Sequence, residues 1–258
     1  MKFKFTVLGC GSSVGVPRID GNFGECNPKN KKNYRTRCSA LISIDDFNIL
    51  IDTSPDLKYQ LLINNVKNIN KVFYTHHHAD QTHGINELRV FYLKTRKKIP
   101  VYADINTKKY LINTFKYCFK TNSHDYPSTL ELNNLKANHS FLHKNKKIFL
   151  RSVSVKHGTI NSIAYIINNK CAYIPDANEI YNKDINLFKN LDFLVIDCLR
   201  YKYHPSHFTL NEILELIKEI KPKKTILTNL NNEIDYSSIQ KQLPKNVVPA
   251  FDGMSFYI

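Results

Sequence analysis

The sequence predicts an α/β sandwich in which helices cover two β-sheets. Apolar strand-like runs occur in both halves of the chain, and each group is accompanied by segments with helical spacing. Three of the apolar runs end in an aspartate, at Asp52, Asp176 and Asp197. A carboxylate there is costly to bury unless it binds a metal, a hydrogen-bond network or a helix terminus. We therefore expect the strands to deliver polar groups to one edge of the sheets.

The first half of the chain opens with strands and continues into helices. Apolar and β-branched runs predict strands, whereas apolar residues three and four apart predict helices. The predicted elements are, in order, strands at 3–8, 40–44 and 49–51, a helix at 57–64, a strand at 71–74, and helices at 85–93 and 110–119.

The second half resumes with strands after a less regular stretch. These strands are predicted at 148–155, 163–167, 172–174 and 193–196. The clearest helix begins at Thr209, whose hydroxyl can accept from an early helix amide while Glu212 reaches back to the amide of Thr209, as in a capping box. Pro222 ends this helix before a buried strand at 225–228.

The composition indicates a globular chain without a membrane segment. The 258 residues are 42% hydrophobic, and no Pro, Gly or Ser linker divides them, which predicts one domain over 1–258. The first apolar run stops at Gly9, too early for a signal peptide, and no later run approaches the roughly 20 residues of a membrane span. We expect a cytoplasmic protein with no membrane partner. The six cysteines lack framework spacing and are expected to be reduced and mostly buried.

The formal net charge of +15 favours an anionic partner, because a basic surface speeds the capture of phosphates. Lysine-rich surfaces are often merely solvated, and lysine and asparagine are common throughout this chain. The lysine clusters are scattered and lack regular aromatic interleaving, so a nucleic-acid partner is the less favoured alternative. The oligomeric state is left open, with a homodimer as one alternative.

A histidine cluster directly follows the strand predicted at 71–74. His76 and His78 are two residues apart, so in an extended segment their imidazoles point the same way, and Asp80 continues that face. Imidazole and carboxylate together suit zinc or another first-row divalent ion. The alternative is a solvated histidine-rich loop. The metal site is favoured because the cluster lies between an apolar strand and an amphipathic helix, where active-site loops are usually built.

Two further segments carry candidate ligands. His157 ends a predicted strand, and Gly158 permits a sharp turn beside it. Asp176 ends another strand and could bridge two ions. Taken alone, His157 could be an ordinary polar residue and Asp176 a helix cap.

The chain resembles the metallo-β-lactamase-fold hydrolases along nearly its whole length. It is most similar to the branch that contains the phosphoribosyl cyclic phosphodiesterases, with tRNA 3′-processing nucleases as more distant kin. The matching segments are 8–13 with 15–17, 37–40, 51–56, the His76 cluster, His157-Gly158, Asp176 and 252–254. The resemblance implies an αββα sandwich of two β-sheets flanked by helices.

The resemblance also implies roles for individual residues. His76, His78 and His157 would hold a first ion, Asp176 would be a carboxylate bridge, and Asp80 would face a second ion and the attacking water. The segment 204–209 resembles the family segment that supplies a histidine that is not a ligand. His207 would be the general acid and His204 is the second candidate. Alternatively, His207 only packs ahead of the helix.

The sequence departs from the family pattern at the second ion. Gln81 replaces the final histidine of the motif, and the segment 228–232, with Asn231 and Asn232, has no histidine where relatives supply another ligand. Losing a residue that only bonds to a metal ligand typically weakens metal binding by roughly 10 to 100-fold. Losing two imidazoles that contact the metal themselves should weaken it more. We expect Zn²⁺ or Mn²⁺ as cofactor, with one tight ion and a second ion weak or absent. The remaining oxygen donors would suit Mn²⁺ or Mg²⁺ better than Zn²⁺.

Three functions follow from these residues. The favoured one is hydrolysis of a small anionic phosphodiester, such as a cyclic ribose phosphate, by a metal-activated water. A second alternative is a weakened or inactive homologue that only binds a metal or ligand, because of the departures at Gln81, Asn231 and Asn232. A third alternative is a tRNA 3′-processing nuclease, which would need a glycine-rich substrate arm, whereas the chain has only eight glycines.

Overall fold

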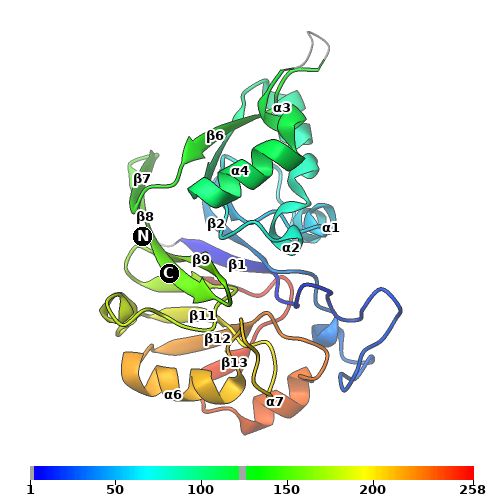
Figure 1. Ribbon diagram of the computed structural model, residues 1–258, viewed down its shortest axis with the longest axis vertical. Helices are drawn as coiled ribbons and strands as arrows, with labels where there is room; N and C mark the ends of the chain where they lie inside the picture. The colour runs from blue at the N-terminus through cyan, green and yellow to red at the C-terminus, as the bar shows by residue number, and fades with distance from the viewer. Residues whose placement is uncertain (1–2, 122–125) are drawn as a thin grey trace.

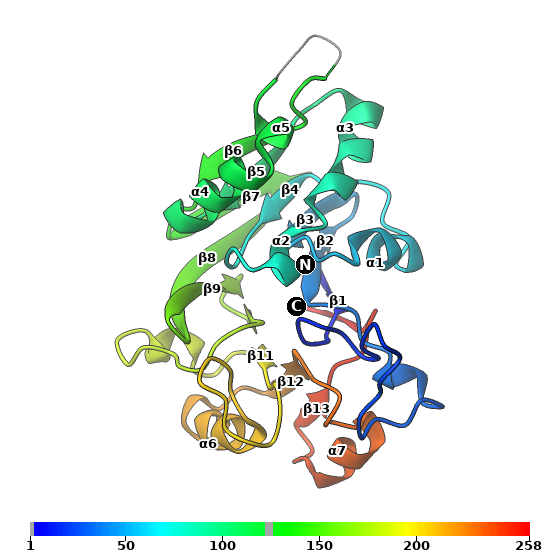
Figure 2. The same ribbon diagram turned by 45° about the vertical axis from the view of Figure 1, so that its right-hand side comes forward.

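The computed structural model describes residues 3–121 and 126–258, which form two facing seven-stranded β-sheets flanked by helices (Figure 1). This arrangement confirms the predicted αββα sandwich. Helices α1 to α5 lie with the first sheet in the upper part of the view, and α6 and α7 lie with the second sheet at the bottom (Figures 1 and 2).

The first sheet has the strand order β14-β1-β2-β3-β4-β5-β6. Its first strands pair antiparallel, and β3 to β6 pair parallel. The bounds are β1 Lys4–Gly9, β2 Ser39–Ile44, β3 Phe47–Ile51, β4 Lys71–Phe73, β5 Ile99–Ala103, β6 Leu130–Asn134 and β14 Ser255–Tyr257.

The second sheet has the order β13-β12-β11-β10-β9-β8-β7. Strands β10 to β13 pair parallel, whereas β7 to β10 pair antiparallel. The bounds are β7 Asn138–His143, β8 Lys146–His157, β9 Ile160–Ile167, β10 Cys171–Ile174, β11 Phe193–Asp197, β12 Lys224–Thr228 and β13 Val247–Pro249.

Successive side chains of the central strands serve two different cores. In β10, Tyr173 packs between the sheets with Phe5 of β1, whereas Ile174 packs on the opposite face with Ile213. Both faces of the strand are therefore buried, which explains the continuous apolar runs in the sequence. The helical segments that complete the layers are α1 Leu57–Ile63, α2 Ala79–Thr82, α3 Arg89–Thr95, α4 Ile105–Thr114, α5 Lys116–Phe119, α6 Leu210–Ile220 and α7 Tyr236–Gln242, with short 3-10 turns η1 Lys31–Asn33, η2 Ile85–Leu88 and η3 Ile185–Phe188.

Helix α6 has the capping box that the sequence predicts. The hydroxyl of Thr209 accepts from the Glu212 amide at 3.3 Å, and Glu212 Oε2 accepts from the Thr209 amide at 2.8 Å. Such a cap stabilises a helix by about 1 kcal/mol. The helix ends at Ile220, one residue before Lys221 takes the left-handed conformation with φ of 49°, and Pro222 follows outside it.

Some elements differ from the sequence predictions. The helix predicted at 85–93 is divided into η2 and α3, and that predicted at 110–119 into α4, which begins earlier at Ile105, and α5. Strands β5, β6, β7, β13 and β14 and helix α7 were not predicted. Strands β6 and β7 contain Asn, His and Ser side chains and are partly exposed, so their apolar signal is weak.

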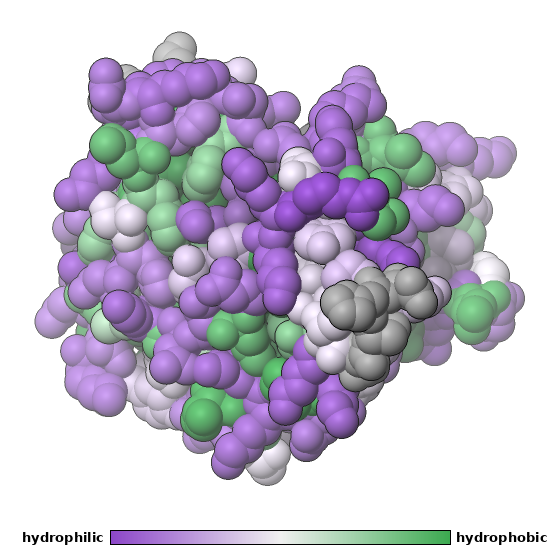
Figure 3. Space-filling model, turned by 90° about the horizontal axis from the view of Figure 1, so that it is seen from above, coloured by the Kyte–Doolittle hydropathy of each residue, from purple (hydrophilic) through white to green (hydrophobic). Residues whose placement is uncertain are grey.

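No helix of the described residues is long and apolar enough to cross a bilayer. The six cysteines are all free and buried, as expected. The face seen from above is mostly hydrophilic, and its hydrophobic side chains gather in separate areas (Figure 3).

Candidate metal centre

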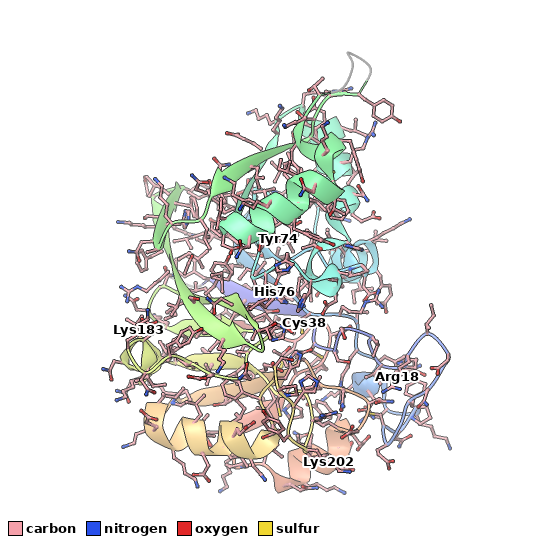
Figure 4. All side chains as sticks on the ribbon, viewed as in Figure 1. Arg18, Cys38, Tyr74, His76, Lys183 and Lys202 are labelled. Atoms are coloured by element: carbon pink, nitrogen blue, oxygen red, sulfur yellow. The ribbon has the colours of Figure 1, made fainter. Side chains whose placement is uncertain are left out.

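Three histidines from the two sheets meet at one point. His76 and His78 lie in the turn between β4 and α2, and His157 is the last residue of β8. His78 Nδ1 lies 2.9 Å from His76 Nε2 and 3.3 Å from His157 Nε2. Figure 4 places His76 near the middle of the molecule. Three imidazole nitrogens within 4.8 Å of one another form a set that could hold one metal ion.

The outer nitrogens of two of these rings are held by the protein. His76 Nδ1 lies 3.0 Å from Thr75 Oγ1, and that hydroxyl donates to Asp52 Oδ2 at 2.9 Å. His157 Nδ1 lies 2.7 Å from the carbonyl oxygen of Ser206, to which it can only donate. A proton on His157 Nδ1 leaves the lone pair on Nε2 directed into the cluster. Outer partners of this kind orient metal-ligating imidazoles and raise their basicity.

The environment keeps the three imidazoles neutral. Burial lowers the pKa of His76 well below its ordinary value and the pKa of His157 to about 4. Burial also lowers the pKa of His78, although the nearby Asp80 opposes this effect. Neutral imidazole is the form that binds a metal.

A second group lies beside the first and combines two carboxylates with a histidine. His207 Nδ1 lies 2.7 Å from Asp197 Oδ2 and 3.8 Å from Asp176 Oδ1. Its ring centre is 4.8 Å from that of His157. Burial alone would lower the pKa of His207, but Asp197 and Asp176 raise it to about 9. The His207 ring is therefore an imidazolium next to carboxylates at neutral pH.

Two carboxamides fill the space around Asp176. Gln81 Nε2 donates to Asp176 Oδ2 at 3.2 Å and to Asp80 Oδ2 at 3.1 Å. Asn229 Nδ2 donates to Asp176 Oδ1 at 3.1 Å and to Asp197 Oδ1 at 3.2 Å. Burial, and then the neighbouring Asp80, raise the pKa of Asp176, whereas the charge of His207 lowers it.

The side chains of Asn231 and Asn232, predicted at the second ion's position, bond to residues other than the carboxylates of the centre. Asn231 Oδ1 accepts from the Glu233 amide, and Asn232 Oδ1 accepts from Arg18 at 3.4 Å. The residue of this segment that reaches the carboxylates is Asn229. It follows β12 in a left-handed conformation with φ of 60°, which asparagine tolerates better than most residues.

The remaining predicted residues lie at the edge of this centre. Asp80 is joined to Asp176 through the Gln81 amide. The ring of His204 is 4.9 Å from that of His207, and His204 Nδ1 is bonded to Ser206. All three strand-end aspartates that the sequence singles out contact the centre or its supporting residues.

Two overlapping sets of side chains in the centre could each hold a metal ion, namely His76, His78 and His157, and His157, Asp176 and His207. The cluster of His76, His78 and His157 offers three neutral nitrogens, and Asp176 lies beside it. Around Asp176, by contrast, Gln81 and Asn229 present N–H groups, which cannot ligate a cation. Gln81 Oε1 is buried without a hydrogen-bond partner among the described residues, which is costly for a carboxamide oxygen.

Sequence reasoning missed the roles of Asn229 and Thr75. Asn229 is part of the segment 228–232, but a left-handed residue is not marked by its neighbours in sequence. Thr75 directly precedes the histidine cluster, and its hydroxyl and amide both bond Asp52. The presence of a hydroxyl residue next to the cluster was the only available signal.

The sandwich and its histidine cluster define a class, the metallo-β-lactamase-fold hydrolases. The model of the "Beta-lactamase superfamily domain" matches residues 47–228, and the chain belongs to this family. Metal-dependent hydrolases, including phosphodiesterases, make up this fold family.

Individual relatives cover 98% or more of the chain. A solved structure described as a new diphosphatase from the PhnP family is 29% identical, with a TM-score of 0.90 and coverage of 100% of this chain and 98% of that one. Zinc-bound PqqB from Methylobacterium extorquens is 18% identical, with a TM-score of 0.73 over 98% and 99% of the two chains, and shows the fold alone. An octanoyltransferase of Porphyromonas gingivalis is 28% identical over 255 residues, which are 98% of this chain and 51% of that protein. The chain therefore spans about half the length of this curated relative.

Proposed function

We propose that this chain hydrolyses a small phosphodiester or diphosphate with one divalent ion, Zn²⁺ or Mn²⁺, held by His76, His78 and His157. The observation that carries this proposal is the convergence of three neutral imidazole nitrogens. In His76 and His157 the other ring nitrogen is hydrogen-bonded to the protein. Similarity to a protein described as a diphosphatase supports chemistry at phosphorus. The net charge of +15 favours an anionic substrate.

The ion would supply an acidified water, because coordination lowers the pKa of water from about 15.7 towards 7. Asp176 would complete the ligand set, and Asp80, linked to it through Gln81, would orient the water. These roles agree with the burial of Asp176 and the partial exposure of Asp80.

His207 is proposed as the general acid. Its Nδ1 bonds the Asp197 carboxylate, which leaves Nε2 as the nitrogen that can donate to a leaving group. With a pKa raised to about 9, the ring carries a proton at neutral pH, although burial opposes this. General acid catalysis of this kind contributes roughly 10² to 10⁴-fold. His204 is the second candidate for the acid.

A binding protein without turnover is the second candidate function. The carboxamides of Gln81 and Asn229 favour it, because they take positions where the family resemblance implies metal-ligating imidazoles. A nuclease remains the less favoured alternative. We propose one domain over residues 1–258 and action in the cytoplasm, without a membrane partner.

Hydrolysis by metal-reconstituted protein tests the proposal. The substrates are bis-p-nitrophenyl phosphate, a cyclic ribose phosphate and a dinucleoside diphosphate. We expect turnover of at least one that falls about 100-fold or more in His207→Ala and in His78→Ala. Asn231→Ala, a matched change outside the centre, should retain activity. Binding without turnover by the natural protein, with activity gained in a Gln81→His and Asn229→His variant, would instead support the binding protein.

A further inference from the structure

A cavity of about 580 Å³ lies apart from the metal centre. It is formed by the two ends of the segment 15–37, by Asp56 and helix α1, and by residues 251–252, and its lining among the described residues includes no side chain of the metal centre. In Figure 2 this segment, in blue, runs below α1 and beside α7. Its volume lies within the roughly 300 to 1,000 Å³ typical of small-molecule sites. The residues that carry the argument are Lys31, Lys32, Tyr34, Arg35, Tyr59 and Phe251.

The cavity has an excess of positive charge. Four basic side chains and two carboxylates line it, so its formal charge is 4 − 2 = +2. Both carboxylates are already engaged, since Asp56 pairs with Arg37 at 2.9 Å and Asp252 accepts from Cys10 and Thr36. Lys31 and Lys32, in contrast, are exposed and pair with no carboxylate of the described residues. Their charges remain available to an anion.

Aromatic rings fix the position of these ammonium groups. Lys32 Nζ lies 4.5 Å from the ring centre of Tyr236 and 4.8 Å from that of Phe251. Lys31 Nζ lies 5.0 Å from the ring centre of Tyr34. Cation–π contacts hold an ammonium in place without pairing it with a carboxylate. Lys32 Nζ also donates to the Tyr236 hydroxyl at 3.2 Å, which uses one of its three N–H groups. The remaining N–H groups can donate to a bound phosphate.

Arg35 adds a buried positive charge to the wall. Its side chain is about 1% exposed, and its guanidinium donates to the carbonyl oxygens of Asn231 at 3.0 Å and Ile234 at 2.7 Å and to the amide oxygen of Asn33. These are neutral acceptors, so the charge is not cancelled by a contacting carboxylate. A charge in a low-dielectric wall acts more strongly on a nearby ligand than a solvated one.

The cavity also offers partly exposed aromatic surface. The rings of Tyr34 and Tyr59 come from different segments and are 41% and 57% exposed. Exposed aromatic side chains next to cationic groups are the combination that binds a planar ring joined to a phosphate, because the ring stacks while the phosphate pairs with the cations.

We propose that this cavity binds a phosphorylated aromatic compound of about nucleoside monophosphate size. Its phosphate pairs with Lys31 and Lys32, and its aromatic ring packs against Tyr34 and Tyr59. The site is separate from the proposed hydrolytic centre and does not depend on that activity. Its ligand is bound and not cleaved there, since no metal-ligand cluster of the described residues lines the cavity.

Calorimetric titration of the full chain with AMP, adenosine and inorganic phosphate tests the proposal. AMP is expected to bind more tightly than either fragment, with a Kd below about 1 mM. The same titration on His157→Ala, which disables the metal centre, should give an AMP affinity within about twofold of the natural protein. No AMP binding, equal binding of a fragment, or loss of binding in His157→Ala would overturn the proposal.

Variants locate the ligand in the cavity. Lys31→Gln with Lys32→Gln should lower the affinity for AMP at least about tenfold and should also lower the affinity for phosphate. Tyr59→Ala should lower the affinity for AMP about fivefold but leave the affinity for phosphate unchanged. The control is Lys147→Gln with Lys245→Gln, which removes the same two charges from exposed positions outside the cavity. All these side chains are exposed, so thermal unfolding should be little changed. Equal weakening by the control pair would show non-specific attraction and overturn the site.

Discussion

Asn229 donates a hydrogen bond to Asp176 Oδ1 at 3.1 Å. Gln81 donates to the other oxygen of the same carboxylate at 3.2 Å. Asp176 is thus held by two neutral N–H donors, where the family resemblance implies the lone pairs of two metal-ligating imidazoles. A carboxamide N–H can stabilise a carboxylate but cannot ligate a cation, and for this reason we propose a single ion.

Metal stoichiometry provides the first prediction. The natural protein should retain one ion per chain after dialysis, because Gln81 and Asn229 direct N–H groups, which cannot bind a cation, towards Asp176. Gln81→His combined with Asn229→His should retain two, as measured by elemental analysis of dialysed protein. Gln81→His combined with Asn231→His is the control and should still retain one, since Asn231 faces away from the carboxylates. Two equally tight ions in the natural protein would contradict the single-ion interpretation.

The second prediction separates a ligand from its neighbours in sequence. His157→Ala should lower metal affinity by more than about 100-fold, because an inner ligand matters more than an outer partner. His77→Ala should leave affinity within a few-fold, since the ring of His77 contacts Tyr110 and lies outside the nitrogen cluster. Competition with a chromogenic chelator measures both. Equal losses would indicate a solvated histidine-rich loop.

The third prediction concerns the support behind His76. Thr75→Val keeps the shape of the side chain but removes the hydroxyl that joins His76 Nδ1 to Asp52. Metal affinity should fall by about tenfold as the ring loses its orientation. Thr95→Val removes a hydroxyl that donates to the Phe91 carbonyl and accepts from the Lys97 amide, and it should leave metal affinity unchanged because neither partner belongs to the metal centre. Unaltered affinity in Thr75→Val would mean that packing alone orients the ring.

The fourth prediction concerns acid stability at the start of α7. Burial alone would raise the pKa of Asp235, but the amides of Asn27 and Ser238 and the side chains of Asn33 and Ser238 donate to its carboxylate and hold the pKa at about 2. The folded value lies below the unfolded value of about 4, so this stabilisation is present above about pH 4 and is lost as pH falls towards 2.

Asp235→Ala should therefore lower the free energy of unfolding by about 1 to 2 kcal/mol near neutral pH, measured by urea denaturation. The difference from the natural protein should shrink below about pH 4. Asp104→Ala is the control, because Asp104 caps α4 with one hydrogen bond from Thr107 and should cost less. A difference that stays constant down to about pH 3 would show that the carboxylate charge is not responsible.

The sequence predicted the sandwich because its strands carry a strong local signal. Strands β10 and β11 are buried on both faces, so continuous apolar runs mark them, and their terminal aspartates mark the edge where the centre forms. Strands β6 and β7 escaped prediction because partial exposure allows polar residues there. Edge strands of this kind depend on pairing with distant segments, which local patterns do not record.

The parts of the candidate site that depend on residue type could be predicted from the sequence. The parts that depend on the direction of the backbone, and so on where a side chain points, could not. The two-residue spacing of His76 and His78 places both rings on one side of an extended segment, and the structure brings them to His157. The direction of the Asn231 and Asn232 side chains could not be predicted, because the left-handed Asn229 turns the chain after β12. That turn sends the side chain of Asn229 to Asp176 and those of the next asparagines elsewhere.

The three histidines come from opposite sheets, so a cation bound by all three would cross-link the two sheets. Binding of the ion would couple the local stability of the β4 region to that of the β8–β9 hairpin. Amide hydrogen exchange should then slow in both sheets together upon metal addition, by an amount that follows the ion's free concentration relative to its Kd. A chelator would accordingly loosen both layers at once, far beyond the few atoms that touch the ion.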